Sequence, residues 1–264
     1  MKYYIIGFFF VFSFSSCNFI ARTMESFVVK EQQKKKVEKE EKVKYVQKKE
    51  GEMRYQYPSG KLKSIVNYKN GKKIGMSHTY YESGEKQYDI PYVDGKKHGK
   101  VIWYYKSGKI YRETDYVKGK RTGWVRKYWE DGSLKSEMEM KNNCYATNLK
   151  EISNTGKVKK KPYITVQRID KIQENGEYTL RFTLHNGRKN AKFYSGKLIE
   201  GKYFPAHGKG FEEIPSRNGV AEIKFNLPPD YEINKEVNIV TFEKTAYQNK
   251  RVLSKKVSVS VRRE

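Results

Sequence analysis

A glycine returns every 24 residues through the middle of this 264-residue chain, at Gly60, Gly84, Gly108 and Gly132. Two further series keep the same step: Gly71, Gly95 and Gly119, and Gly75, Gly99 and Gly123. A fixed period of this length is typical of stacked copies of one small structural unit. The sequence therefore predicts an extended surface built from repeats, which argues against an enzyme with a single deep pocket.

Each copy of the repeat reads as two short strands separated by two turns. Pairs such as Ser83-Gly84 and Asp94-Gly95 stand where the backbone must reach a positive φ, which glycine adopts with little strain. The segments between the turns are rich in Tyr, Val, Ile and Trp, which suit a pleated, half-buried strand. Two turns in each period predict an antiparallel meander of β-hairpins.

Aromatic residues keep the same register as the glycines. Two columns are expected to form ladders in the core of the repeats: Tyr57, Tyr81, Tyr105 and Trp129, and Tyr68, Tyr92 and Tyr116 followed by Met140. Because side chains alternate along a strand, a column one residue away points to the opposite face. We expect that column to form an exposed aromatic strip that contacts a partner; it consists of Tyr80, Tyr104 and Tyr128.

The repeat pattern weakens between Lys141 and Lys161. Gly156 keeps the 24-residue step, but Asn143 and Thr147 stand where the pattern expects glycine. Terminal repeats are usually atypical because they cap the stack. These residues therefore predict a degenerate last copy that closes one end of the sheet.

The repeats resemble a known family. The pattern Tyr-x-Ser-Gly-Lys, as at residues 105–109, is followed by Tyr-x-x-Gly-Lys-Lys-x-Gly, as at residues 92–99, and is similar to the bacterial MORN-variant repeat over about residues 55–161. The resemblance implies a stack of β-hairpins, an antitoxin role by the label that the family carries, and scaffolding by analogy with eukaryotic MORN proteins. Ile74 and Thr122 replace the usual histidine that His98 keeps, which argues against a repeated histidine site.

The first 16 residues read as a signal peptide: a basic start is followed by an apolar run that is too short to span a membrane. Small residues before Cys17 resemble the lipobox of bacterial lipoproteins, with Phe14 in place of the usual leucine. The sequence thus predicts lipidation of Cys17 and a protein anchored in the bacterial cell envelope, in the outer membrane if the cell is Gram-negative. The alternative is an ordinary signal peptide with a chance cysteine.

Residues 17–52 are predicted to contain the lipidated Cys17 and a charged tether. The composition becomes polar from Met24 to Gly51, with few apolar side chains to bury, so we expect a solvated segment, which could be helical. The hairpin repeats follow at residues 53–161. If Cys17 is lipidated, Cys144 has no intramolecular partner and is read as a small buried apolar residue.

The 24-residue step stops in residues 162–264, where apolar and polar residues alternate instead. Strands are predicted at 164–169, 178–184, 192–200, 221–227, 237–242, 251–253 and 257–261, with turns at pairs such as Asn175-Gly176 and Asn218-Gly219. About seven short strands in about 100 residues favour an immunoglobulin-like β-sandwich. A five- or six-stranded barrel is the alternative. The predicted fold class is all-β throughout.

The net charge of +25 has two interpretations: it reflects the general composition of the chain, which the richness in lysine favours, or it serves to bind anionic partners. Six cations follow the second turn of successive repeats and are the expected contacts: Lys72, Lys73, Lys96, Lys97, Lys120 and Arg121. Anionic glycans, lipid headgroups and acidic proteins fit an exported chain. Nucleic acid is disfavoured because an exported protein rarely meets it, and part of the charge is explained by a general richness in lysine.

Signals of catalysis are weak. The four histidines, His78, His98, His185 and His207, are scattered and show no metal-ligand spacing, and no phosphate-binding glycine loop is present. We therefore expect no enzyme activity, no cofactor and no metal. The sequence favours a membrane-anchored binding or scaffolding protein; the alternative is an envelope antitoxin or immunity-type protein that neutralises a protein toxin.

Overall fold

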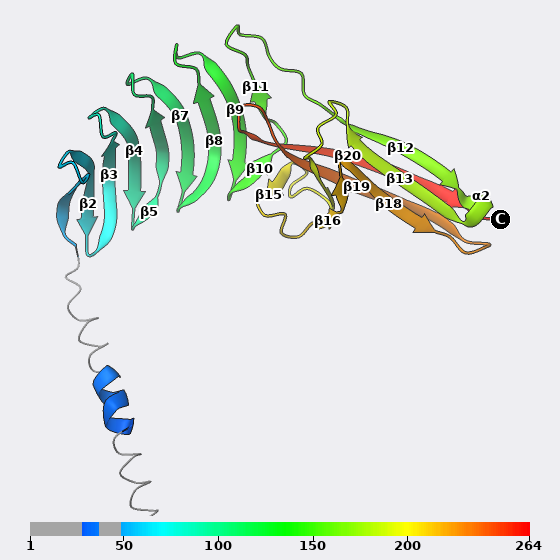
Figure 1. The fold of residues 1–264 in the computed structure, drawn as a ribbon, viewed down its shortest axis with the longest axis horizontal. Coiled ribbons are helices and arrows are strands. Elements are labelled where there is room, and N and C mark those ends of the chain that lie inside the picture. Colours follow the sequence, from blue (N-terminus) through cyan, green and yellow to red (C-terminus); the bar gives the residue numbers. More distant parts are fainter. Residues whose placement is uncertain (1–27, 37–48) are drawn as a thin grey trace, which may run out of the picture. The chain divides into compact units, whose positions relative to one another are not determined.

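The computed structural model describes residues 28–36 and 49–264 (Figure 1). Cys17, the predicted signal peptide and most of the predicted tether lie outside the described residues. Residues 28–36 form a helix with an ion pair of 3.0 Å between Lys35 and Glu31. No helix among the described residues is long and apolar enough to cross a membrane. Residues 50–264 form a compact unit, described by itself below.

The predicted meander of hairpins is confirmed. One antiparallel sheet of twelve strands contains all the repeats, and neighbouring strands in the sheet are mostly neighbours in the sequence. Its strands are β1 (Gly51–Gln56), β2 (Leu62–Lys69), β3 (Lys72–Tyr80), β4 (Lys86–Val93), β5 (Lys96–Lys97), β6 (Gly99–Tyr104), β7 (Ile110–Val117), β8 (Lys120–Tyr128), β9 (Leu134–Lys141), β10 (Cys144–Ala146), β11 (Lys150–Glu151) and β15 (Tyr203–Pro205).

One kind of hairpin turn recurs along the sheet. Both of its central residues have a positive φ, as in Asn70 (52°) and Gly71 (77°), which is the arrangement of a type I′ hairpin turn. Asn142 and Asn143 repeat that geometry with φ of 49° and 67°. Asparagine tolerates this region better than most residues, so the degenerate copy keeps its turn without glycine.

Hydrogen bonds between repeats join the copies along both edges. The hydroxyl group of Tyr57 donates to the backbone carbonyl of Tyr80 at 2.8 Å, one repeat further along. Tyr81, Tyr105 and the Trp129 indole make the same bond to Tyr104, Tyr128 and Ile152. At the opposite edge, backbone N–H groups donate from Gly95 to Lys73, from Gly119 to Lys97 and from Asn143 to Arg121. The first aromatic column is thus part of the scaffold, as the sequence predicts.

The remaining residues form two four-stranded antiparallel sheets. One sheet contains β12 (Ile164–Lys171), β13 (Glu177–Leu184), β18 (Val220–Asn226) and β17 (Ser216–Arg217). The other contains β16 (Glu212–Ile214), β14 (Lys192–Ser195), β19 (Glu232–Lys244) and β20 (Lys250–Arg262). The short helix α2 (Ile172–Asn175) joins β12 to β13.

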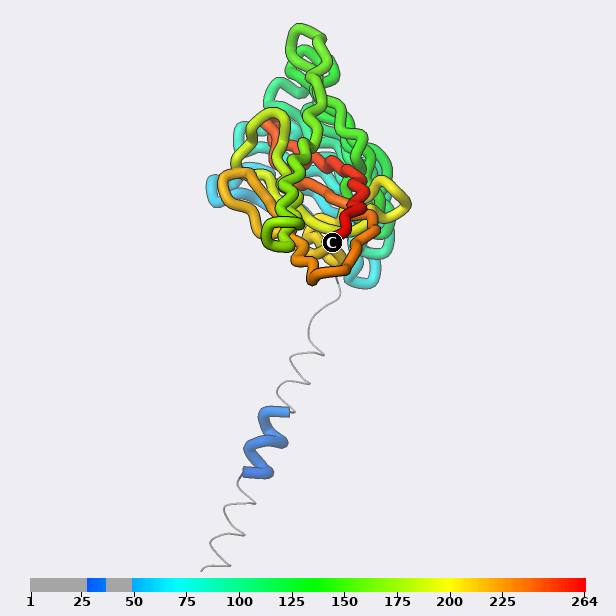
Figure 2. Tube along the Cα trace, turned by 90° about the vertical axis from the view of Figure 1, so that its right-hand side faces the viewer, coloured from blue at the N-terminus to red at the C-terminus, as the bar shows by residue number. Residues whose placement is uncertain are grey.

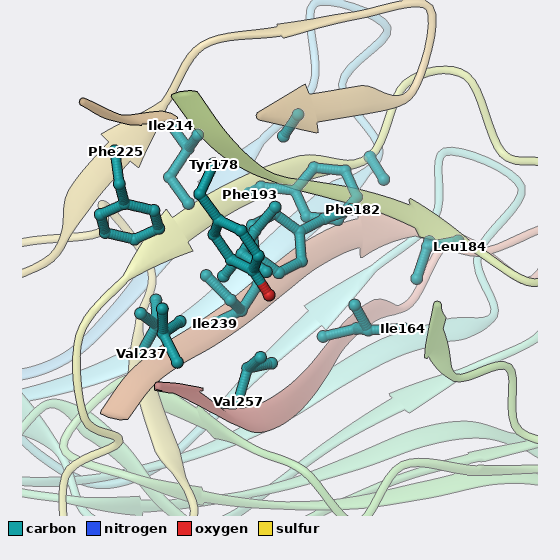
Figure 3. Packing of buried hydrophobic residues seen from close by; sticks show 14 of the residues in the cluster. Ile164, Tyr178, Phe182, Leu184, Phe193, Ile214, Phe225, Val237, Ile239 and Val257 are labelled. Carbon is teal, nitrogen blue, oxygen red and sulfur yellow. The ribbon is translucent and has the colours of Figure 1, made fainter. Parts of the chain in front are cut away.

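The two four-stranded sheets share one apolar core, drawn in Figure 3. Phe182 from β13, Phe193 from β14 and Ile239 from β19 are fully buried in it. Two separate sheets around one core are the arrangement of a β-sandwich and argue against a closed barrel, whereas the immunoglobulin-like type stays a prediction. The strand predicted over 192–200 ends at Ser195, because Gly196 turns the chain with a φ of 139°.

The repeat sheet and the C-terminal sheets also share packing. β15 pairs with β10 and so adds a strand from the C-terminal half to the repeat sheet. A second apolar cluster joins Met138 and Met140 of β9 to Phe204, Val240 and Val252. The long β19–β20 hairpin reaches the last repeat in Figure 1, and Figure 2 shows the repeats behind the C-terminal half.

Candidate binding face

The repeat sheet has two faces with different chemistry, because side chains alternate along each strand. The pairing register places His78 opposite Asp89 on one face and Thr79 opposite Tyr88 on the other. We call the first the paired face; it includes Tyr80, Asp89, Tyr104, Glu113, Trp124, Arg126, Tyr128 and Glu137. We call the second the aromatic face; it includes Tyr57, Tyr81, Tyr88, Tyr92, Lys97, Trp103, Tyr105, Tyr111, Arg112, Tyr116, Arg121, Lys127 and Trp129.

On the paired face a carboxylate recurs every 24 residues, and each one contacts at least one basic side chain. The pairs are Asp89 with His78 at 2.5 Å and Lys86 at 3.3 Å, Glu113 with Lys100 at 3.3 Å, and Glu137 with Arg126 at 3.5 Å. This face therefore balances its own charges.

The column that the sequence predicts as an exposed aromatic strip lies on the paired face. Tyr80, Tyr104 and Tyr128 are half-buried, so the expectation of an exposed strip is wrong. The hydroxyl group of Tyr104 donates to Asp89 at 2.7 Å, and that of Tyr128 donates to Glu113 at 3.0 Å. Burial and the bond to Asp89 raise the pKa of Tyr104 to about 12. These phenols are engaged within the sheet.

Hydrogen bonds also set the charge state of Asp89. Burial alone would raise the pKa of this carboxyl group, but hydrogen bonds from Tyr104, His78 and Lys86 outweigh that effect and lower it. Asp89 is thus held as an anion that its neighbours already satisfy.

On the aromatic face the cations lie over rings and not beside carboxylates. The pairs are Lys63 over Tyr57 (5.4 Å), Lys73 over Tyr92 (5.2 Å), Lys97 over Tyr116 (5.3 Å), Arg112 over Trp103 (5.0 Å) and Arg121 over Tyr145 (5.5 Å). Within residues 28–36 and 49–264, none of these five cations forms an ion pair with a carboxylate. Their positive charge is therefore left without a carboxylate counter-ion among the residues that the structure describes.

The centre of the aromatic face is a cluster of rings. Trp103 stacks on Tyr88 with 5.2 Å between the centroids and meets Tyr111 edge-on at 4.6 Å. Tyr111 in turn meets Tyr105 edge-on at 5.0 Å. The Trp103 indole donates to the Tyr81 hydroxyl group at 3.0 Å. All five side chains are half-buried, so their exposed edges line the surface.

Two hollows mark this face. One of about 390 Å³ is lined by Tyr88, Val101, Arg112 and Thr114 among others. The other, of about 780 Å³, follows the turn edge and is lined by the Tyr68, Tyr92 and Tyr116 column with Lys73, Lys97 and Arg121. Each repeat adds two strands, so its cation lies about 10 Å from the next along the stack.

The six predicted binding cations divide into two groups. Lys73, Lys97 and Arg121 are half-buried on the aromatic face, each opposite a tyrosine of the neighbouring strand. Lys72, Lys96 and Lys120 are exposed at the turns, where Lys72 reaches Asp94 at 3.9 Å. The structure thus brings three of the six together with the aromatic column.

Crowding of like charges is visible in the pKa values. Burial lowers the pKa of Lys97, and the nearby Lys73 and Arg112 lower it further. Burial, then Arg112 and Lys135, lower the pKa of Lys127 to about 8. A bound anion would relieve this repulsion and raise both pKa values again.

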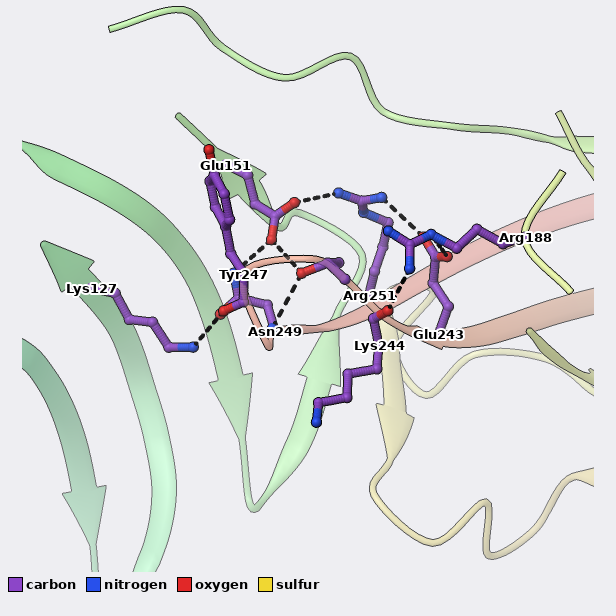
Figure 4. A network of polar contacts seen from close by, with 9 residues as sticks. Lys127, Glu151, Arg188, Glu243, Lys244, Tyr247, Asn249 and Arg251 are labelled. Carbon is purple, nitrogen blue, oxygen red and sulfur yellow. Dashed lines mark hydrogen bonds and ion pairs between the residues drawn. The ribbon is translucent and has the colours of Figure 1, made fainter. Parts of the chain in front are cut away.

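The far end of the aromatic face is covered by the turn between β19 and β20, residues 245–249, which we call the tip turn (Figure 4). Lys127 donates to the backbone carbonyls of Tyr247 at 3.2 Å and Gln248 at 3.4 Å. The Tyr247 ring meets Trp129 edge-on with 5.3 Å between centroids.

A buried polar cluster, which we call the clamp, holds the tip turn in place. Glu151 of β11 accepts from Thr245 at 2.5 Å, from Asn249 at 2.7 Å and from Arg251 at 2.7 Å. Arg251 also donates to Glu243 at 2.9 Å. Sequence reasoning missed the clamp, because its members lie about 100 residues apart and show no shared pattern.

The described part of the chain holds no candidate metal site. No group of three or more histidine, cysteine, aspartate or glutamate residues could hold a metal ion there. Cys144 is half-buried on β10, less buried than the sequence predicts, and burial raises the pKa of its thiol.

Comparison with known families supports the repeat assignment. The MORN repeat variant matches at residues 49–70, 97–118 and 121–142. These segments contain the β1–β2 and β8–β9 hairpins and most of β5–β7. The hairpin of β3 and β4 lies outside the matches, yet it has the same turns and the same bonds to its neighbours. No curated protein matches the chain.

Proposed function

We propose that this chain is a non-enzymatic binding protein whose aromatic face holds an anionic partner. One observation carries the proposal: five cations on that face lie over aromatic rings, and none of them pairs with a carboxylate of the described chain. Cations over rings are partly desolvated, so an anion that reaches them is attracted more strongly than it is by a lysine in open water. The partner class is an acidic protein, glycan or lipid surface.

The geometry suits an extended partner. The cation column of Lys73, Lys97 and Arg121 repeats along the stack at a step of about 10 Å. A partner with repeated negative charges would meet several of these cations at once. Multiple weak contacts of this kind give an affinity that falls as salt rises.

Membrane anchoring through Cys17 belongs to this proposal. Lipidation would hold the repeats at the cell envelope on the charged tether, and several acyl chains at about 0.8 kcal/mol for each buried CH₂ make a stable anchor. The Cys17→Ser variant should leave the membrane fraction or keep the mass of the precursor. An unchanged membrane fraction with a fully processed N-terminus would contradict lipidation.

The binding proposal is tested with three anionic probes and the full chain without its signal segment: phosphatidylglycerol vesicles, polygalacturonate and polyglutamate. We expect at least one to bind at low salt and to weaken as salt is raised to the physiological range. Absence of binding to all three at low salt contradicts the proposal.

An envelope antitoxin or immunity-type protein is the second candidate. The aromatic face favours it, because Trp, Tyr and Arg are the residues most enriched at the centres of protein interfaces. Purification from the native envelope should then yield one protein partner in a fixed stoichiometric ratio. Recovery of lipid or glycan alone favours the first candidate.

A further inference from the structure

The aromatic face already holds one polypeptide segment, its own tip turn. Three kinds of contact seat it on the last repeat. The Tyr247 ring lies edge-on to Trp129, and Lys135 and Lys159 lie over that ring at 5.2 and 3.7 Å. Lys127 donates to two backbone carbonyls of the turn. The face therefore binds a ring and free carbonyl groups through aromatic and cationic side chains.

The tip turn has the shape of a tight β-hairpin turn. The Thr245 N–H donates to the carbonyl of Asn249 at 2.9 Å, and the Gln248 N–H donates to the carbonyl of Thr245 at 3.0 Å. These bonds leave the carbonyls of Tyr247 and Gln248 to accept from Lys127. A ring projects from the same turn, so ring and carbonyl groups arrive together.

The preceding repeat also presents rings and a cation, although from other positions, and the contacts of the tip turn described above are all made by residues that follow it. Tyr105 stands 24 residues before Trp129, and Trp103 stands 24 residues before Lys127. Arg112, the strand neighbour of both Trp103 and Lys127, supplies the cation. Arg112 lines the hollow of about 390 Å³, and Trp103 stacks on Tyr88, which also lines it.

One difference between the two repeats predicts the charge of the occupant. At the last repeat, the carboxylate of Glu151 lies close enough to Lys127 to raise its pKa against the effect of burial. No carboxylate acts on the pKa of Lys97 in this way, and within the described residues Lys97 and Arg112 lie over rings and form no ion pair with a carboxylate. An occupant of the open repeats must therefore bring the negative charge itself.

We propose that the open part of the aromatic face, from β2 to β7, docks an acidic loop of a protein partner with an aromatic residue at its tip. The loop sits on Trp103, Tyr105 and Arg112 as the tip turn sits on Trp129 and Lys127. This inference rests on the proposed binding function and names the partner class for it. The face is rich in Trp, Tyr and Arg and poor in acids, which is typical of the core of a protein interface.

The test compares four soluble probes on the full chain without its signal segment, at one salt concentration. They are a Glu–Tyr copolymer, polyglutamate, polygalacturonate and a single-stranded oligo-dT. We expect the Glu–Tyr copolymer to bind at least about tenfold more tightly than polyglutamate. Trp103→Ala should remove most of that difference in affinity. It removes the ring that the tyrosines of the copolymer contact, whereas polyglutamate has no aromatic ring and loses no such contact. Arg112→Gln should weaken the binding of both the Glu–Tyr copolymer and polyglutamate.

A matched control lies on the other face. Trp124 is exposed on the paired face and also has an arginine, Arg126, over its ring at 5.1 Å. Trp124→Ala should leave the affinity for the copolymer within about twofold of the parent protein. If Trp103→Ala fails to fold, hydrogen exchange replaces it, and the copolymer should protect β6 and β7 more than β9.

The outcomes separate the inference from the proposed function. Equal affinity for the copolymer and polyglutamate would overturn the aromatic-tip inference and leave anion binding intact. Tighter binding of polygalacturonate or oligo-dT than of the copolymer would assign the face to another class of macromolecule and overturn it as well. Failure of all four probes to bind would count against the proposed function itself.

Discussion

The two faces of the repeat sheet are encoded by the same 24-residue period but treat their charges differently. On the paired face, Asp89 pairs with Lys86 of its own strand, and Glu113 pairs with Lys100 of the neighbouring strand. On the aromatic face, cations such as Lys97 and Arg112 meet rings. Within the described residues, the carboxylates of one face are paired with basic side chains, whereas these cations of the other face have no carboxylate partner.

The difference indicates that the side chains of the paired face serve to stabilise the fold, whereas those of the aromatic face have a further role. Exposed ion pairs contribute about 0–1 kcal/mol each and exposed cations over rings about 0.5–1 kcal/mol, so either face could support a stable sheet. Yet on the aromatic face burial lowers the pKa of Lys97, and the neighbouring cations Lys73 and Arg112 lower it further, so their mutual repulsion is not offset there. We infer that the aromatic face keeps this arrangement for binding.

The largest predicted difference between the faces concerns two carboxylates on neighbouring strands. Glu151 is buried and accepts three hydrogen bonds in the clamp, whereas Glu137 is half-buried and pairs with Arg126. Glu151→Ala should lower the free energy of unfolding by about 3–5 kcal/mol, because it leaves Arg251 with one carboxylate in a buried site. Glu137→Ala should cost about 1 kcal/mol or less. Urea unfolding measures both, and similar losses would contradict the described clamp.

The bonds between repeats give a smaller effect. Tyr105→Phe removes the hydroxyl group that donates to the Tyr128 carbonyl at 2.8 Å and should lower the free energy of unfolding by about 1 kcal/mol. Tyr111→Phe is the matched control on the same face, since Tyr111 packs through its ring. It should change stability by less than about 0.5 kcal/mol. A larger loss of stability from Tyr111→Phe than from Tyr105→Phe would contradict the scaffold role of the aromatic column that contains Tyr105.

Stability at alkaline pH reports on the crowded cations. The pKa of Lys127 falls from 10.5 to about 8 in the folded protein. Between these values the unfolded chain binds more protons at this site, so the contribution of Lys127 to the free energy of unfolding rises with pH. Urea unfolding between pH 7 and pH 10 should show a steeper rise for the parent protein than for Lys127→Met. Parallel curves would contradict the burial of the Lys127 charge.

The smallest effect distinguishes two consecutive tyrosines. Tyr104 donates to Asp89 on the paired face, whereas Tyr105 points to the aromatic face. Tyr104→Phe should raise the pKa of Asp89, because it removes a hydrogen bond that stabilises the anion. Tyr105→Phe should leave that pKa unchanged. An NMR titration of the Asp89 carboxyl carbon measures both, and equal shifts would show that the two side chains do not alternate as described.

Local periodicity explains how much of the fold could be predicted. The 24-residue step places Gly71 and Gly95 in their turns, and alternation places Tyr104 and Tyr105 on opposite faces. What alternation does not reveal is the partner of each side chain. The carboxylate that engages Tyr104 comes from Asp89, 15 residues earlier, so a column that looks free in the sequence is occupied in the structure.

Contacts over long sequence distances explain what could not be predicted. Glu151 and Arg251 lie 100 residues apart, and no local pattern links them. β15 lies in the C-terminal half of the sequence but pairs with β10 of the repeat sheet, and no alternating pattern of apolar and polar residues marks it as a strand. The domain boundary predicted between residues 161 and 162 stays a prediction that residues 53–161 and 162–264 fold independently of each other.

Matched neutralisation of the two faces tests the central claim most directly. Lys97→Gln with Arg112→Gln removes two charges from the aromatic face, and Lys86→Gln with Lys100→Gln removes two from the paired face. Polyglutamate binding should weaken by about tenfold or more in the first variant and by less than about threefold in the second. Equal weakening in two folded variants would mean that binding follows net charge alone and would contradict a dedicated binding face.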